Sequence, residues 1–207
     1  MSDRFSKVVS VALSPLLMPA VVALLVLLDI GSGPAEIVTT VSVAFVSLFA
    51  VPLADILWMV RRGKTPTPDV PNREARTEPF VIAVISGSAA VLAIRAMGMH
   101  GEPIIHAILV AYVINMILVM GINAAWKISV HMAGLGGSIA ILLIVSGLSG
   151  DNSPVLTGST VIPLLLLIPI VGWARYRLNA HTMAQIVVGA IVGFGGHWLA
   201  LLAQVGR

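Results

Sequence analysis

The sequence contains no cysteine, and only 10% of its 207 residues are charged. The absence of cysteine excludes disulfide bonds and thiolate metal sites. The shortage of charge excludes a water-soluble domain, because 58% of the residues are hydrophobic and a chain of this size has too little interior to hide them. The composition therefore indicates an integral membrane protein.

Seven apolar segments are each long enough to cross the hydrocarbon core of a bilayer, which takes roughly 20 helical residues. Gly, Pro, Asp and Asn mark most of the turns between them, and no segment alternates as a strand does. The expected spans are residues 9–28, 37–60, 79–98, 103–126, 130–149, 155–174 and 182–204. The sequence therefore predicts an all-α fold: a single integral membrane domain over residues 1–207, built as a polytopic bundle of about seven transmembrane helices.

Most basic residues fall on one side of the predicted bundle. Seven spans place the N-terminus and the loops after the second, fourth and sixth spans at one membrane face. Ten of the twelve Lys and Arg residues then lie on that face: Arg4, Lys7, Arg61, Arg62, Lys64, Arg73, Arg76, Lys127, Arg175 and Arg177. Such a bias in short loops ordinarily sets membrane orientation. It predicts a cytoplasmic location for this face, and the net charge of +3 then needs no nucleic-acid partner.

Two histidines on this face stand where a polar turn meets an apolar segment. His181 precedes Gln185 by four residues, a spacing that places both side chains on one face of a helix and lets the amide orient the imidazole. His131 follows Lys127 and Ser129 at the start of the fifth expected span. Imidazoles beside several arginines form a combination suited to phosphate chemistry.

Displacement at phosphorus is catalysed mainly by positioning and by cations around the equatorial oxygens. A guanidinium binds two phosphate oxygens at once. One neutral imidazole can attack phosphorus while a second protonates the leaving oxygen. The candidate catalytic residues are His181, His131 and Gln185, and the candidate phosphate ligands are Arg73, Arg76, Lys127, Ser129 and Arg175. No metal-ligand spacing is present, so we expect no metal and no other cofactor.

These clusters resemble the signatures of the type-2 phosphatidic acid phosphatase superfamily, which also contains the vanadium haloperoxidases. The run from Arg175 through His181 to Gln185 resembles Ser-Arg-(five)-His-(three)-Asp. Lys127-Ile-Ser-Val-His131 resembles Pro-Ser-Gly-His, and the segment from Asp69 to Pro79 occupies the place of Lys-(six)-Arg-Pro. The resemblance covers about residues 61–195. Within the superfamily, the chain is similar to a divergent bacterial subgroup of membrane proteins.

The resemblance implies a phosphatase core with a nucleophile at His181, an acid at His131, and phosphate binding by Arg175 and by Arg73 or Arg76. It implies hydrolysis of a lipid phosphate or polyprenyl diphosphate in the bacterial inner membrane. Gln185 stands where the family has Asp, and an amide cannot stabilise an imidazolium by charge.

Two alternatives stay open. A catalytically inactive phosphatase-like protein would bind anionic lipid or act as a subunit of a membrane complex; Gln185 and the loosely matched first signature favour it. The expected partners are the lipid bilayer, a lipid phosphate substrate, and further copies of the chain or a membrane complex. A transporter is disfavoured, because the sequence has no clear inverted repeat and its ionisable residues gather at one surface.

Overall fold

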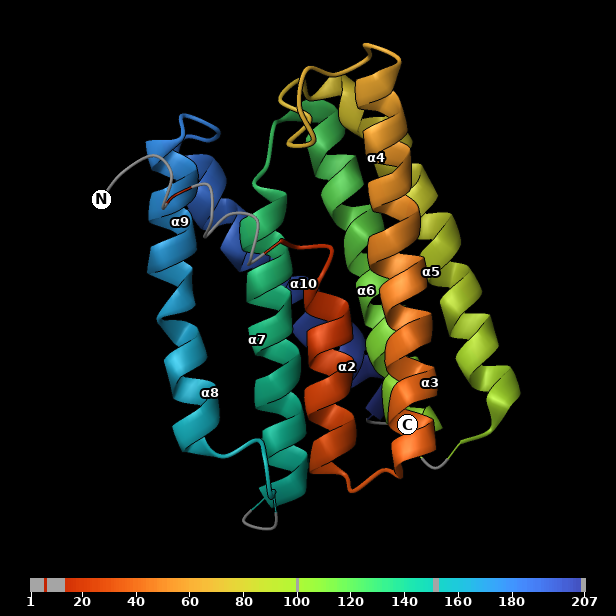
Figure 1. Cartoon of the computed structure of the whole chain (residues 1–207). Coiled ribbons are helices and arrows are strands. Elements are labelled where there is room, and N and C mark those ends of the chain that lie inside the picture. Colours follow the sequence, from red (N-terminus) through yellow and green to blue (C-terminus); the bar gives the residue numbers. More distant parts are fainter. Residues whose placement is uncertain (1–5, 7–13, 100, 151–152, 206–207) are drawn as a thin grey trace.

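Helices run up and down between two ends of the molecule, and their connections alternate between those ends (Figure 1). The structure, a computed structural model, describes residues 6, 14–99, 101–150 and 153–205. Every regular element within these residues is helical. In chain order they are α2 (Met18–Asp29), α3 (Pro34–Phe45), η1 (Val46–Ala50), α4 (Val51–Arg61), η2 (Glu74–Arg76), α5 (Thr77–Met97), α6 (Glu102–Ala125), α7 (Val130–Ser149), α8 (Gly158–Leu165), α9 (Leu167–Arg177) and α10 (Met183–Val205).

Five expected spans are confirmed as helices long and apolar enough to cross a membrane. They cover Pro34–Arg61, Glu74–Met97, Pro103–Ala125, Val130–Ser149 and Met183–Gln204. α8 and α9 lie end to end in the place of the sixth expected span (Figure 1). α2 forms the later part of the first, whose residues before 14 lie outside the described part of the chain. The chain is therefore an all-α integral membrane protein with about seven helices across the bundle, as the sequence predicted.

Prolines explain the two irregular spans. Pro52 has no N–H, and its ring would collide with the carbonyl four residues earlier, so the chain widens into the π-helical turn η1 between α3 and α4. Pro169 likewise leaves the carbonyl of Leu165 without its helical donor. The backbone breaks there, and the Leu166 N–H donates to the Pro163 carbonyl at 3.1 Å in a tighter turn. Both spans keep their direction across the break.

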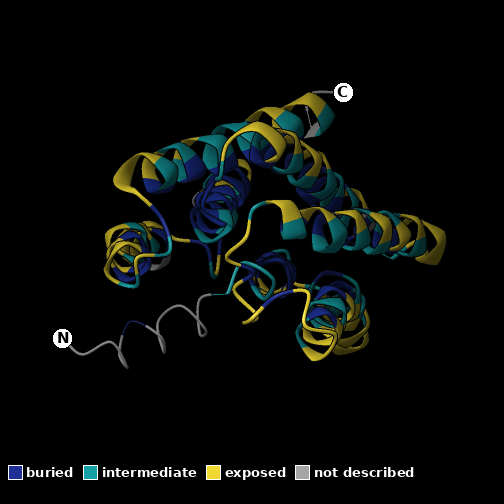
Figure 2. Ribbon diagram, turned by 90° about the horizontal axis from the view of Figure 1, so that it is seen from above, coloured by how far each residue is buried: buried dark blue, intermediate teal, exposed yellow. Residues whose placement is uncertain are grey.

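α7 is the central helix of the bundle (Figure 2). Its span is 67% buried, whereas Pro34–Arg61 is 22% buried. Glycines bring α7 and α10 into backbone contact, because a Cβ on Gly136 would collide with the Ala190 backbone and one on Gly193 with the Ala133 backbone. Along the length of the two helices, Ser129 lies against Gly189 and Gly137 lies against His197, so α7 and α10 run parallel and begin at the same end of the molecule.

The opposite end is closed by the carboxylate of Asp29, the last residue of α2. It accepts hydrogen bonds from the hydroxyls of Ser149 and Ser153 at 2.8 and 2.5 Å. It also accepts from the backbone N–H groups of Val155 and Leu156 at 3.0 and 2.8 Å. Four donors on one carboxylate join α2 to the α7–α8 loop, which gives this buried acid a structural role.

Candidate anion site at the starts of α7 and α10

The turn between α9 and α10 is set by a left-handed residue. The N–H of Ala180 donates to the carbonyl of Arg175 at 3.1 Å and that of Asn179 to Tyr176 at 2.9 Å, which is the Schellman arrangement. Asn179 takes the positive φ of 50° that this motif needs, and Asn tolerates it better than most residues. The chain reverses here, and His181 follows directly.

A capping box then holds His181 in one orientation. The N–H of Gln185 donates to the Thr182 hydroxyl at 3.3 Å, and the N–H of Thr182 donates to the Gln185 side-chain oxygen at 3.2 Å. A backbone N–H can only donate, so the oxygen of the Gln185 amide must point this way. That same oxygen lies 3.1 Å from Nδ1 of His181. Nδ1 therefore carries the proton, and Nε2 keeps its lone pair.

Three cations from separate segments lie near this imidazole. Arg76, in η2, is buried and donates from Nε to the Val70 carbonyl at 2.8 Å and from Nη1 to the Ile128 carbonyl at 3.1 Å. Lys127, between α6 and α7, donates from Nζ to the Ala180 carbonyl at 3.0 Å. Arg175, at the end of α9, is only 1% exposed. Figure 1 shows the connections that carry them at one end of the bundle.

Asp69 supplies the carboxylate that faces these cations. Its Oδ1 lies 3.1 Å from Nη1 of Arg175, and its side chain is 52% exposed while that of Arg175 is 2% exposed. Asp69 is not among the site residues that the sequence predicted. The two residues are 106 positions apart, so no local pattern could have paired them. Asp69 balances one of the three positive charges and leaves two in excess.

The excess positive charge acts on His181. Burial lowers the pKa of the imidazole, and the charges of Arg76 and Arg175 lower it further, from an ordinary value of 6.5 to about 3. The hydrogen bond that His181 donates to Gln185 raises the pKa and opposes this shift only in part. Burial, Arg76 and Arg175 also lower the pKa of Lys127. His181 is consequently a neutral imidazole at physiological pH, next to guanidinium and ammonium groups that favour an anion.

The remaining candidate residues occupy different positions. Arg73 donates from Nη1 to the Ala124 carbonyl at 2.7 Å, so it caps the C-terminal end of α6. Of the two arginines proposed for the first signature, Arg76 is thus the one next to His181. Ser129 is fully buried at the start of α7, its N–H donates to the Gln185 carbonyl at 3.3 Å, and its hydroxyl has no hydrogen-bond partner among the described residues.

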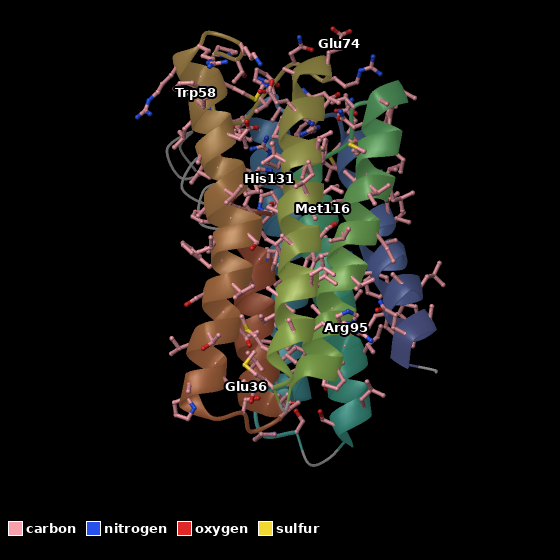
Figure 3. All side chains as sticks on the ribbon, turned by 90° about the vertical axis from the view of Figure 1, so that its right-hand side faces the viewer. Glu36, Trp58, Glu74, Arg95, Met116 and His131 are labelled. Carbon is pink, nitrogen blue, oxygen red and sulfur yellow. The ribbon has the colours of Figure 1, made fainter. Side chains whose placement is uncertain are left out.

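His131 lies in the first turn of α7 and is half-buried. Figure 3 shows it in the same half of the bundle as Trp58 and Glu74, below their level. It shares a helix face with Gly134, which packs against Pro15, whereas Ser129 and Met132 face α10. His131 therefore lies at the same end of the molecule as His181, on a face of α7 other than the one that packs against α10.

Within the described ranges, no three His, Asp or Glu side chains form a group able to hold a metal ion. Comparisons of the chain with protein-family models, with curated proteins and with solved structures found no match. The class that the fold defines is therefore an all-helical integral membrane protein, and the site adds a buried neutral histidine beside three cations and one carboxylate.

Proposed function

We propose that this protein is an integral membrane phosphatase that hydrolyses a lipid phosphate or a polyprenyl diphosphate through a phosphohistidine at His181. One observation carries the proposal: a buried imidazole, neutral and held in one tautomer, has Arg76, Lys127 and Arg175 as its charged neighbours. A neutral imidazole with a free Nε2 is the form that attacks phosphorus. The cations suit a phosphoryl group whose charge grows on its oxygens in the transition state.

The reaction proceeds in two displacements. The lone pair of His181 Nε2 forms a bond to phosphorus as the bond from phosphorus to the lipid oxygen breaks, and His131 gives its proton to that leaving oxygen. Water then attacks phosphorus and loses a proton to His131, while the P–N bond breaks and returns the lone pair to Nε2. The products are the lipid alcohol and inorganic phosphate, and both histidines regain their starting states.

The substrate class follows from where the cluster lies. It is at an end of the bundle, where the polar connections meet the apolar spans, so an amphiphile can stay in the bilayer while its phosphate reaches Arg76 and Arg175. The resemblance to a bacterial subgroup of membrane phosphatases leads us to propose the bacterial inner membrane as its location.

A second candidate function is an inactive phosphatase-like protein that binds anionic lipid. Gln185 favours it, because this residue is fully engaged in a helix cap and brings no charge to the histidine. The salt bridge between Asp69 and Arg175 also favours it, since one proposed phosphate ligand already holds a carboxylate.

Phosphate release from phosphatidic acid or a polyprenyl diphosphate by the purified protein tests the proposal. His181→Ala is expected to lower turnover by about 100-fold or more, because it removes the nucleophile. His106→Ala is the matched control, since His106 lies at the far end of α6. Rapid quenching of the wild type in alkaline detergent, with substrate radiolabelled in its phosphate, should trap a phosphohistidine that acid then hydrolyses. Full turnover by His181→Ala would contradict the proposal. Binding of the lipid without release would favour the inactive protein.

A further inference from the structure

The carboxylate of Asp69 binds Arg175, one of the residues proposed to bind phosphate. Its oxygen lies 3.1 Å from the guanidinium nitrogen Nη1, within hydrogen-bond distance. Arg175 is almost fully buried, and the side chain above it that does reach solvent is that of Asp69. Asp69 is thus the solvent-exposed partner of a guanidinium that is itself almost out of contact with solvent.

The loop that carries Asp69, residues 62–76, is held in a strained conformation. Val70 has a φ of 44°, a left-handed value that a β-branched side chain rarely adopts. Its side chain is buried, its N–H donates to the Thr67 carbonyl at 3.1 Å, and its carbonyl accepts from Arg76. The contacts on either side of Asp69 hold its carboxylate beside Arg175 in spite of this strain.

We propose that Asp69 is a specificity-determining residue, an internal anion that excludes phosphodiesters from the cluster and yields to the dianionic phosphate of a monoester or terminal diphosphate. The inference rests on the proposed function for the identity of the site, and it names the class of phosphate admitted. The inference also explains how a cationic site at a membrane can avoid occupation by phospholipids that carry a single negative charge.

The selectivity has an electrostatic origin. A phosphodiester carries one negative charge, as Asp69 does, so exchanging one for the other leaves the charge of the cluster unchanged. Asp69 is tethered to the site, which gives it a high effective concentration against a free monoanion. A phosphomonoester carries close to two negative charges above pH 7, so it neutralises one more cation than Asp69 can. Only the dianion thereby gains enough to displace the carboxylate.

The test measures binding of two lipids at pH 8, without reliance on turnover. The full-length protein in nanodiscs of neutral lipid is titrated with phosphatidic acid, a monoester, and with phosphatidylglycerol, a diester. The wild type is expected to bind the monoester at least tenfold more tightly. Asp69→Asn keeps the shape of the side chain and removes its charge, and it is expected to strengthen phosphatidylglycerol binding by tenfold or more, with a smaller gain for phosphatidic acid. Glu74→Gln removes the same charge from an exposed position in the same loop and is expected to leave the ratio unchanged.

A second measurement does not depend on a substitution within the cluster. Thr67 is exposed and the chain contains no cysteine, so Thr67→Cys introduces a single site for a fluorophore on the loop. The emission of this fluorophore is expected to change on addition of phosphatidic acid, with the same half-saturation as binding. Phosphatidylglycerol is expected to leave the emission unchanged. Equal shifts of both affinities in Asp69→Asn, or saturating monoester binding without a change at Thr67, would overturn the inference. Selective binding without phosphate release would refute the proposed catalysis and leave the role of Asp69 standing.

Discussion

Gln185 performs two tasks with one side-chain oxygen. It completes the capping box of α10 with Thr182, and it accepts the hydrogen bond from Nδ1 of His181. Glu is the other residue that a capping box accepts at this position. A carboxylate there would preserve the helix cap and the tautomer of His181 while adding the negative charge that the amide lacks.

Gln185→Glu is therefore expected to raise the pKa of His181 from its value near 3 toward the ordinary 6.5. The nucleophile must be unprotonated, and His181 of the wild type stays unprotonated throughout pH 5–8. The titration of His181 should therefore cause no change of wild-type kcat/KM in this range. In the variant, activity should fall as the pH drops through the raised pKa, because the protonated fraction then grows. NMR titration of labelled histidine gives the pKa directly.

Met183→Glu is the control for that experiment. It places the same charge in the first turn of the same helix at an exposed position. A His181 pKa that moves equally in both variants would show that Gln185 does not act through its hydrogen bond.

At the scale of elements, the site depends on how closely α7 approaches α10. Ser129 begins one helix and Gln185 lies in the first turn of the other, and the N–H of Ser129 donates to the Gln185 carbonyl at 3.3 Å. Glycines at Gly189 and Gly193 permit this approach, since a Cβ at either would meet backbone atoms of α7. The packing of apolar helix interiors thus sets the spacing of polar groups at their ends.

Gly193→Ala should destabilise the protein by about 1–3 kcal/mol, because its Cβ would overlap the carbonyl of Ala133 and neither backbone can move without separating the helices. Thermal unfolding in detergent measures the loss as a lower Tm. Gly195→Ala is the matched control two residues along α10, where the added Cβ meets nothing within 4 Å. It should be neutral or stabilising, since Ala favours the helix by about 1 kcal/mol over Gly. Equal effects of the two substitutions would show that helix contact is not the cause.

At the scale of the whole molecule, the loops with the cluster and the loops with Asp29 lie at opposite ends (Figure 1). Arg73, Arg76, Lys127 and Arg175 have contacts within the protein that explain their charge, so they are poor indicators of membrane orientation. The other Lys and Arg residues of the sequence still divide unequally between the ends: Arg4, Lys7, Arg61, Arg62, Lys64 and Arg177 against Arg95 and Arg207.

This bias predicts that the end with His181 faces the cytoplasm, although the resembling family ordinarily works on the extracytoplasmic side. Thr67→Cys should stay unlabelled by an impermeant maleimide in intact cells and react after permeabilisation. Gly33→Cys is the control on the opposite end, in the exposed connection before α3, and it should react in intact cells. The reverse pattern would place the cluster outside.

The sequence by itself determined the spans, because a helix must satisfy its own backbone in lipid and roughly 20 apolar residues are a local signal. The alternation of the spans then brought the loops of Arg76, Lys127 and Arg175 to one end. The contact between His181 and Gln185 was also predictable, since residues four apart share a helix face. The Thr182–Gln185 cap could have been read from the same segment.

Only the tertiary structure decided which charges meet. Arg73 and Arg76 lie in one loop and look equivalent in sequence, yet one binds the end of α6 and the other lies near His181. Asp69 pairs with Arg175 across 106 residues, and the low pKa of His181 arises from burial and from cations on other segments. These effects depend on distance and on exclusion of water, which are properties of the packed helices and not of any single stretch of chain.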